Sequence, residues 1–431
     1  MITCEYTIPG LHVREHRIDV PLDWGDPEGA AISVFARELV APDRRGEELP
    51  ALLYLQGGPG GKSPRPTAAD GWIGQALERY RVVLLDQRGT GRSTRVDGRT
   101  MAAFPDASAG ARYLSRFRAD SIVRDAEALR HSDFGGRPWT TLGQSYGGFL
   151  TLTYLSFAPE GLAACLVTGG LAAVTPDASE VYRRTYPRVA AKTRTFYRRY
   201  PHDAEVVGRI ADRLAAEVVR LPDGDALTVR RFQSLGIDFG MKPGFERMHW
   251  LVDEAFTDGG EELSDTFLEQ VLHRSSYTDD PLFAAMQESI YGSGDGATGW
   301  AAERERANHP EFAETGRPML FTGEMIYPWM FEEIRGLRPF GPAVELLATR
   351  DHWPDLYDLD RLAANEVPLV AAVYFDDMYV DSGLQLQTAA RVGNAHAWVT
   401  NEYEHDGLQS DRVFTHLMEL LDDGGWSTTN D

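Results

Sequence analysis

The stretch Gly143-Gln144-Ser145-Tyr146-Gly147-Gly148 decides the fold class of this 431-residue chain. A short apolar run that reads as a strand, Trp139 to Leu142, precedes it, and a helical run, Phe149 to Leu155, follows it. A serine on a sharp strand-to-helix turn has a strained backbone and an exposed hydroxyl, and its neighbours must lack side chains if the turn is not to collide with itself. The motif therefore predicts that Ser145 is a nucleophile; the alternative is a serine that only caps a helix.

Further apolar runs lie on both sides of this motif. Several, such as Leu52–Leu55 and Pro368–Phe375, are apolar throughout rather than alternating, which is typical of strands buried on both faces of a parallel sheet. A helical stretch, Ala119 to His131, separates two of them in a βαβ rhythm, so the sequence predicts an α/β fold with a mostly parallel, doubly wound sheet. The expected strands are His16–Leu22, Ala31–Ala36, Leu52–Leu55, Arg81–Asp86, Trp139–Leu142, Ala163–Val167, Pro368–Phe375 and His396–Thr400.

A long helical region interrupts the strands. Its amphipathic runs are Val181–Tyr200, Ala204–Leu221, Gly244–Phe256, Ser264–Leu272 and Ala284–Tyr291. We therefore expect a core formed by residues 1–171 and 346–431, with a helical cap of residues 172–345 inserted between its two parts.

Composition excludes several classes of function. With 43 lysines and arginines against 65 acids, the net charge of −22 argues against binding to nucleic acid or to anionic lipid. Only three of those cations are lysines, at positions 62, 192 and 242. Two cysteines, Cys4 and Cys165, are too few for a disulfide framework, and neither a signal peptide nor a membrane span is visible, so we expect a cytoplasmic protein. The pair His12 and His16 lacks the context of a metal site, and no metal is expected.

A serine nucleophile needs a base and an acid that orients the base. On this kind of turn the acid follows the serine in the chain and the histidine comes last. The strand ending at Phe375 is followed by Asp376 and Asp377, and the strand ending at Thr400 is followed by a loop containing His405. We predict a catalytic triad of Ser145, Asp377 and His405, with Asp376 as the alternative acid.

The tetrahedral intermediate also needs hydrogen-bond donors for its oxyanion. One donor is expected to be the backbone N–H of Tyr146, which directly follows the nucleophile. The other is expected from the loop Gln56-Gly57-Gly58-Pro59-Gly60, where glycines let the backbone approach the substrate. The candidate is the N–H of Gly58; the alternative is a plain glycine and proline turn.

Three segments together resemble the prolyl aminopeptidases (proline iminopeptidases) of the α/β-hydrolase fold, in the longer subgroup with an enlarged helical cap. They are Gln56–Gly60, Gly143–Gly148 and Asp86-Gln87-Arg88-Gly89-Thr90-Gly91-Arg92-Ser93. Shorter members have histidine where this chain has Gln56, and Asp86 and Arg88 are interpreted as residues that brace their loop. The resemblance implies a serine exopeptidase that needs no cofactor and acts on peptides with a free N-terminal proline.

Such an enzyme must recognise a cationic amine, and acids buried near the nucleophile would do this. Gln287-Glu288-Ser289-Ile290-Tyr291 resembles the family's Glu-x-x-Tyr helix, which makes Glu288 the first candidate. Glu324, in the aromatic segment Thr322–Trp329, is the second. Tyr146, Phe149, Tyr291, Tyr327 and Trp329 are candidates for the wall of a proline pocket.

Two other functions remain open at the level of the sequence. One keeps the fold and changes the substrate, giving an esterase, lactonase or amidase that acts on a small metabolite. The other is a binding protein without catalysis, which an intact candidate triad disfavours. Epoxide hydrolases and dehalogenases are disfavoured because they need an aspartate where Ser145 stands. The sequence leaves the oligomeric state open.

Overall fold

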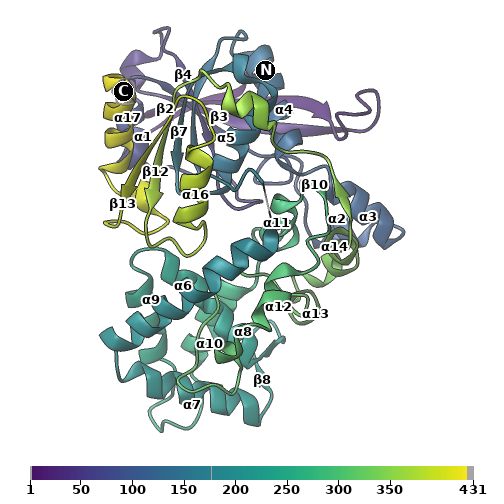
Figure 1. The fold of residues 1–431 in the computed structure, drawn as a ribbon, viewed down its shortest axis with the longest axis vertical. Helices are drawn as coiled ribbons and strands as arrows, with labels where there is room; N and C mark the ends of the chain where they lie inside the picture. The colour runs from purple at the N-terminus through teal and green to yellow at the C-terminus, as the bar shows by residue number, and fades with distance from the viewer. Residues whose placement is uncertain (1, 176, 425–431) are drawn as a thin grey trace.

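The protein is built around a nine-stranded sheet (Figure 1). The computed structural model describes residues 2–175 and 177–424. The strand order is β1-β2-β3-β5-β4-β6-β7-β12-β13. The strands are β1 (Ile2–Ile8), β2 (Leu11–Pro21), β3 (Ala31–Val40), β4 (Ala51–Leu55), β5 (Arg81–Asp86), β6 (Trp139–Gln144), β7 (Leu162–Thr168), β12 (Leu369–Tyr374) and β13 (Ala395–Thr400).

From β5 onward every neighbouring pair in this order is parallel, whereas β1, β2 and β3 form an antiparallel edge. Helices cover both faces, and side chains from one strand enter two separate cores: Leu53 and Leu55 in one, Leu52 and Tyr54 in the other. Both sets are apolar because neither face meets water. The predicted α/β fold with a mostly parallel, doubly wound sheet is confirmed. The helices around it are α1 (Gly71–Ala76), α2 (Gly98–Ala102), α3 (Ala107–Leu114), α4 (Ala119–Asp133), α5 (Tyr146–Phe157), α15 (Leu359–Ala363), α16 (Ser382–Ala389) and α17 (Val413–Asp423).

Between β7 and β12 the chain leaves the sheet and forms the lower, helical part of the molecule in Figure 1. Its helices are α6 (Ala178–Arg199), α7 (Asp203–Ala216), α8 (Val229–Gln233), α9 (Gly244–Asp253), α10 (Asp265–Ser275), α11 (Pro281–Met286), α12 (Ala301–Arg306), α13 (Met330–Glu333) and α14 (Gly341–Ala348). Two small ribbons, β8 (Val219–Arg220) with β9 (Ala226–Leu227) and β10 (Gly294–Asp295) with β11 (His352–Trp353), complete it. The boundaries at 171/172 and 345/346 stay predictions.

Two local expectations were wrong, and one strand was not predicted. Strand β1 was not foreseen, because Ile2–Ile8 is exposed and lacks an apolar pattern. The helix expected to end at Leu221 ends at Ala216, where the chain turns into the ribbon β8–β9. The helix expected over Ala284–Tyr291 is broken: α11 ends at Met286, and a separate 3-10 turn follows at Ser289–Tyr291. Glu288 therefore lies at a junction rather than on a helix.

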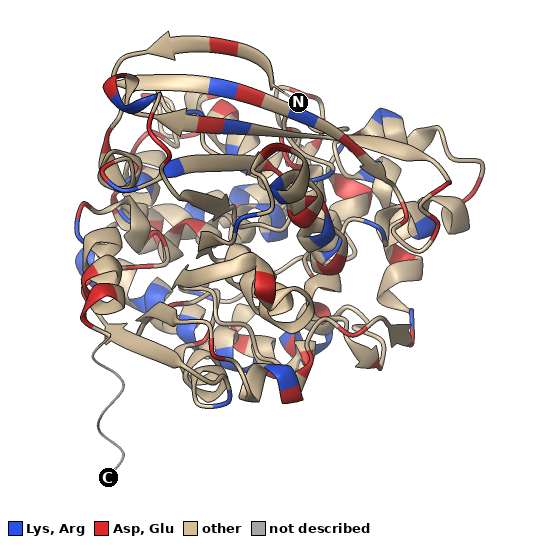
Figure 2. Ribbon diagram, turned by 90° about the horizontal axis from the view of Figure 1, so that it is seen from above, with Lys and Arg blue, Asp and Glu red and all other residues tan. Residues whose placement is uncertain are grey.

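The acidic charge is spread over the chain. Figure 2 shows acidic and basic residues interspersed along the helices, strands and loops in view. No helix within the described residues has both the length and the apolar character that a membrane span requires.

Candidate active site

Ser145 occupies the strand-to-helix turn that the sequence predicts. It lies between the last residue of β6 and the first residue of α5, with φ 55° and ψ −123°. A positive φ is unfavourable for a residue with a side chain and persists only where the surroundings enforce it. Here Ser145 N–H donates to Thr168 O of β7 at 2.9 Å, and Ser145 O accepts from Gly148 N at 2.8 Å. These backbone hydrogen bonds thus hold Ser145 in its strained conformation.

The glycines around this turn are required by contact. A Cβ on Gly147 would collide with Leu55 O of the neighbouring strand, and a Cβ on Gly143 would collide with Gly147 itself. Gly57, in the loop after β4, faces the nucleophile directly: a Cβ there would lie 2.9 Å from the Cβ of Ser145. The loop and the turn can be this close only because side chains are missing from both.

Asp377 and His405 are hydrogen-bonded. His405 Nδ1 lies 2.7 Å from Asp377 Oδ2, and both residues are buried. The other carboxylate oxygen, Oδ1, accepts the backbone N–H groups of Tyr379 at 2.8 Å and Val380 at 3.1 Å. Asp376 is exposed to solvent. Of the two candidate acids, Asp377 is the one the structure brings to the histidine.

The surroundings of His405 favour its charged form. Burial alone would lower the pKa of the imidazole, but the charge and hydrogen bond of Asp377, with smaller contributions from Glu324 and Asp406, outweigh burial and raise it. Gly169, next to the acceptor of the Ser145 N–H, packs against the ring; a Cβ there would lie 3.2 Å from Nδ1. Within the described residues the Ser145 hydroxyl makes no hydrogen bond. Such bonds often form only in the substrate complex.

The oxyanion candidates face the same turn. Tyr146 is the first residue of α5, where the backbone N–H has no partner within the helix. Gly58 has a φ of +138° and belongs to the loop that contacts Ser145 through Gly57. A hydrogen bond from the segment after β5 holds this loop in place: Gln87 Nε2 donates to Gln56 O at 2.8 Å.

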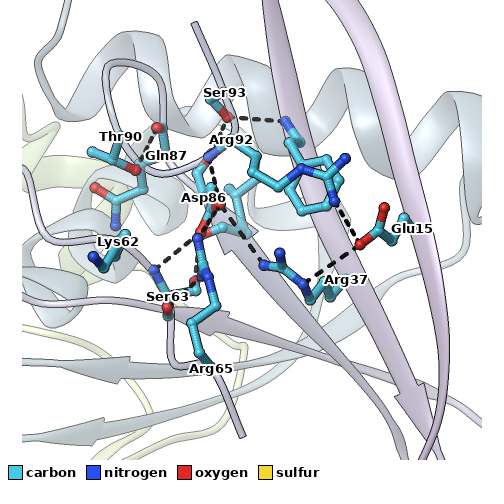
Figure 3. A network of polar contacts seen from close by, with 12 residues as sticks. Glu15, Arg37, Lys62, Ser63, Arg65, Asp86, Gln87, Thr90, Arg92 and Ser93 are labelled. Carbon is cyan, nitrogen blue, oxygen red and sulfur yellow. Dashed lines mark hydrogen bonds and ion pairs between the residues drawn. The ribbon is translucent and has the colours of Figure 1, made fainter. Parts of the chain in front are cut away.

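The braces behind that loop centre on Asp86 (Figure 3). Asp86 is fully buried and accepts from both terminal nitrogens of Arg65, at 2.9 and 2.7 Å, and from the backbone N–H of Ser63 and Arg92. Arg88, equally buried, pairs with Asp125 of α4 at 2.5 Å. Both side chains thus stabilise the loops through ion pairs and hydrogen bonds.

Comparison with known proteins identifies the family. Residues 50–222 match the α/β hydrolase fold family. The chain is 47% identical to a proline iminopeptidase of Aeromonas sobria, over 96% of this chain and 98% of that protein. It is 35% identical to a proline iminopeptidase of Aspergillus aculeatus, over 96% of this chain and 95% of that one.

The chain belongs to the proline iminopeptidase family. The resemblance stated from its motifs is therefore correct, and it covers nearly the whole chain rather than the motifs alone.

The sequence predicts that Glu288 and Glu324 bind the substrate amine. Of these two acids, Glu324 is the one whose carboxyl interacts with the charges of His405 and Asp377. Burial raises the pKa of Glu324 to about 7; the His405 charge lowers it and the Asp377 charge raises it. Gln287, beside the other candidate, is its hydrogen-bonding neighbour. The charges of both His405 and Asp377 thus act on the Glu324 carboxyl.

Glu288, the other candidate acid, also caps a helix. Its Oε1 accepts the backbone N–H of Ala302 at 3.0 Å, at the start of α12, where Trp300 offers no side-chain cap. Its Oε2 is buried and has no hydrogen-bond partner in the described part of the chain. Burial raises the pKa of Glu288 to about 7, against the hydrogen bonds that lower it. Oε1 thus accepts a hydrogen bond at the start of α12, and Oε2 remains available to a further donor.

Aromatic rings connect the nucleophile to these acids. Tyr146 contacts Phe149 at 5.7 Å between centroids, Phe149 contacts Tyr291 at 6.0 Å, and Tyr291 contacts Tyr182 at 6.4 Å. Tyr327 instead bonds Tyr186 and stacks on Trp329. Tyr182 was not among the aromatic residues predicted from the sequence, where the only signal was its position in a helical stretch of the insertion. Among the described residues, no group of three or more histidine, cysteine or acidic side chains could hold a metal ion.

Proposed function

We propose that this protein is a serine aminopeptidase that hydrolyses the N-terminal residue, preferentially proline, from peptides. The observation that carries the proposal is the buried Asp377–His405 pair, 2.7 Å apart, together with a serine on a strained turn, in a chain of the proline iminopeptidase family. The two relatives, both proline iminopeptidases, supply the substrate class. We further propose a cytoplasmic location, in keeping with the free thiols of Cys4 and Cys165, the state that a reducing compartment maintains.

In the first half of the reaction, Ser145 Oγ attacks the carbonyl carbon of the N-terminal residue. His405 Nε2 takes the hydroxyl proton as the bond forms. The oxyanion is held by the N–H groups of Tyr146 and Gly58. When the C–N bond breaks, His405 gives its proton to the leaving amine nitrogen, and the acyl group stays on Ser145.

In the second half, water attacks the acyl carbon. His405 takes a proton from the water and returns it to Ser145 Oγ as the ester bond breaks, which releases the free amino acid. Asp377 accepts the Nδ1–H of His405 throughout, so that the ring presents Nε2 to the serine and carries its positive charge at less cost. No metal or organic cofactor has a step in this scheme.

Recognition of the free amine falls to Glu324 and Glu288. A substrate ammonium beside Glu324 would stabilise the ionised carboxylate, which burial otherwise disfavours. The free Oε2 of Glu288 is a second acceptor, provided that its other oxygen keeps its bond to α12. Rings of Tyr146, Phe149 and Tyr291 supply apolar surface for a pyrrolidine.

The test compares proline p-nitroanilide with its N-acetylated form, which lacks the charge. We expect release of nitroaniline from the free amine only, and loss of about 10⁴- to 10⁶-fold in kcat for Ser145→Ala. A p-nitrophenyl ester measures the rival activity. Equal turnover of blocked and free substrates, or esters cleaved in preference to the anilide, would favour an esterase or amidase. Full activity in Ser145→Ala would remove the nucleophile assignment.

A further inference from the structure

The loops that carry Asp377 and His405 are held from outside the sheet. Both follow strands of the core, β12 and β13, yet their ion pairs run to α6, the first helix of the insertion. Figure 1 shows α6 crossing beneath the ends of these two strands. Three basic residues of α6, spaced four apart, make the contacts: Arg184, Arg188 and Lys192, here called the α6 basic stripe. That spacing puts them on one face of the helix.

The first two members hold the aspartate loop. Arg188 donates to Asp381 Oδ2 at 2.8 Å, to Phe375 O at 2.8 Å and to Ser382 Oγ at 3.0 Å. Arg184 adds a bond of 3.4 Å to Asp381 Oδ1. Phe375 and Asp381 flank Asp377 on either side in the chain. The loop is thus anchored at both ends by one guanidinium group.

Lys192 holds the histidine loop. Its ammonium lies 2.5 Å from both carboxylate oxygens of Glu404, the residue before His405. The side chains of Lys192 and Glu404 are only 13% and 18% exposed, so the pair is screened far less than a surface ion pair. Burial raises the pKa of Glu404, and the charge of Lys192 acts against that rise.

Other parts of the insertion form hydrogen bonds with the same loop. His405 N–H donates to Gly240 O at 2.9 Å, and the Asp406 carboxylate accepts the Lys242 backbone N–H at 3.0 Å. Lys242 Nζ donates to Glu402 O at 2.6 Å. Residues 402, 404, 405 and 406 therefore each bond to the insertion. The imidazole itself meets the core through Asp377, but the backbone that carries it rests on helices outside the sheet.

We propose that the α6 basic stripe positions the catalytic residues. Within it, the ion pair of Lys192 with Glu404 determines the position of His405. The proposal rests on the function proposed above, because it assumes that His405 is the base. Ion pairs at both loops couple Asp377 and His405 to one helix, so a shift of α6 would move the pair together. Loss of the Lys192–Glu404 pair would instead move the histidine loop alone.

This arrangement predicts where a defect would be seen. A displaced imidazole reduces proton transfer from Ser145 but leaves the amine-binding acids in place. The expected change is therefore in kcat, by about 10- to 100-fold for a displacement of the order of 1 Å, with KM little altered. A purely structural role of the pair would lower thermal stability and leave kcat of the folded protein unchanged.

The experiment measures two rates on the full chain for Lys192→Met, Glu404→Gln and Lys192→Arg. One is kcat and KM on proline p-nitroanilide; the other is the rate at which a fluorophosphonate labels Ser145, followed by intact mass. Labelling depends on activation of Ser145 and not on the substrate class. Arg194→Met is the matched control, because Arg194 is an exposed residue on the same helix. Thermal unfolding shows which variants are folded.

We expect Lys192→Met and Glu404→Gln to lose kcat and labelling rate together, Lys192→Arg to recover most of both, and Arg194→Met to match the wild type. Wild-type kcat and labelling rate in folded Glu404→Gln would overturn the proposal, even if Lys192→Met fails to fold. A wild-type protein that is labelled but leaves the anilide intact refutes the proposed substrate, while the labelling rates still decide the role of the stripe. A wild-type Ser145 that resists labelling overturns both.

Discussion

Replacing Asp377 by asparagine should change the proton position on His405 rather than the shape of the site. The Asp377 Oδ1 atom accepts two backbone N–H groups, from Tyr379 and Val380. An asparagine must keep its oxygen there, because its NH₂ group would face two donors. The NH₂ is then turned toward His405 Nδ1, which must act as an acceptor, and the proton moves to Nε2. The imidazole can no longer take a proton from Ser145.

The size of the loss separates this tautomer effect from a lost hydrogen bond. A hydrogen bond to a charged group is worth about 1.5–3 kcal/mol, or roughly 10- to 150-fold in rate. The wrong tautomer in a serine triad costs about 10⁴-fold in kcat, equivalent to about 5.4 kcal/mol of transition-state stabilisation. Since Asp377 is 1% exposed and its geometry is fixed by two backbone donors, we expect the larger value.

The assay is kcat on proline p-nitroanilide for Asp377→Asn and, as the matched control, for Asp376→Asn. Asp376 is the exposed neighbour that a reading of the sequence leaves as the alternative acid. We expect the control to match the wild type. A loss of less than about 100-fold in Asp377→Asn would refute the tautomer argument, and a loss confined to Asp376→Asn would reassign the acid.

Three further substitutions test the surroundings of the site. Glu324→Gln should raise KM for the free-amine substrate by at least tenfold, since an ammonium beside a carboxylate is stabilised by about 1.5–3 kcal/mol, measured by steady-state kinetics. Gln87→Leu removes the donor to Gln56 O and should lower kcat by about two- to tenfold through a looser oxyanion loop, measured on the same substrate. Arg88→Met leaves Asp125 buried without its cation and should lower the free energy of unfolding by about 3–5 kcal/mol in urea denaturation.

Each of these has a result that contradicts it. The N-acetylated anilide, measured as a competitive inhibitor because it is not expected to be cleaved, should bind independently of Glu324, so an equal rise in its inhibition constant would point to a general disturbance. Gln87→Leu with unchanged kcat would mean that the loop holds its place without the bond. Arg99→Met, at a pair whose arginine side chain is 95% exposed, is the control for Arg88→Met and should change stability by no more than about 0.5 kcal/mol.

The sequence predicted best where local chemistry leaves one solution. The Gly143–Gly148 motif requires a tight turn between strand and helix, and Ser145 has the strained backbone that follows. Apolar runs located the six parallel strands of the main sheet to within a few residues, because buried parallel strands need apolar side chains on both faces. Strand β1 has no such face, and antiparallel pairing with β2, the next strand in the chain, is what holds it.

Other features depend on contacts that no local pattern records. Asp376 and Asp377 are identical side chains one residue apart, and only the register of the loop decides which one turns inward. Glu288 was expected on a helix, yet tertiary packing ends that helix at Met286 and gives one of its oxygens to α12. The α6 basic stripe has a helical spacing in the sequence, but its partners come from loops about 200 residues further along the chain.

The position of Glu324 links substrate binding to the state of the base. Glu324 contributes to raising the pKa of His405, and at its own pKa of about 7 it is partly charged in the free protein. An ammonium group paired with Glu324 would cancel this contribution and repel a protonated imidazole, so the pKa of His405 should fall when substrate binds. The profile of kcat/KM against pH reports the free protein and that of kcat reports the complex. The acidic limb of kcat should therefore lie at lower pH than that of kcat/KM, and Glu324→Gln should narrow the gap. Limbs that coincide in the wild type would mean that the amine binds elsewhere, because a cation at Glu324 cannot leave the titration of His405 unchanged.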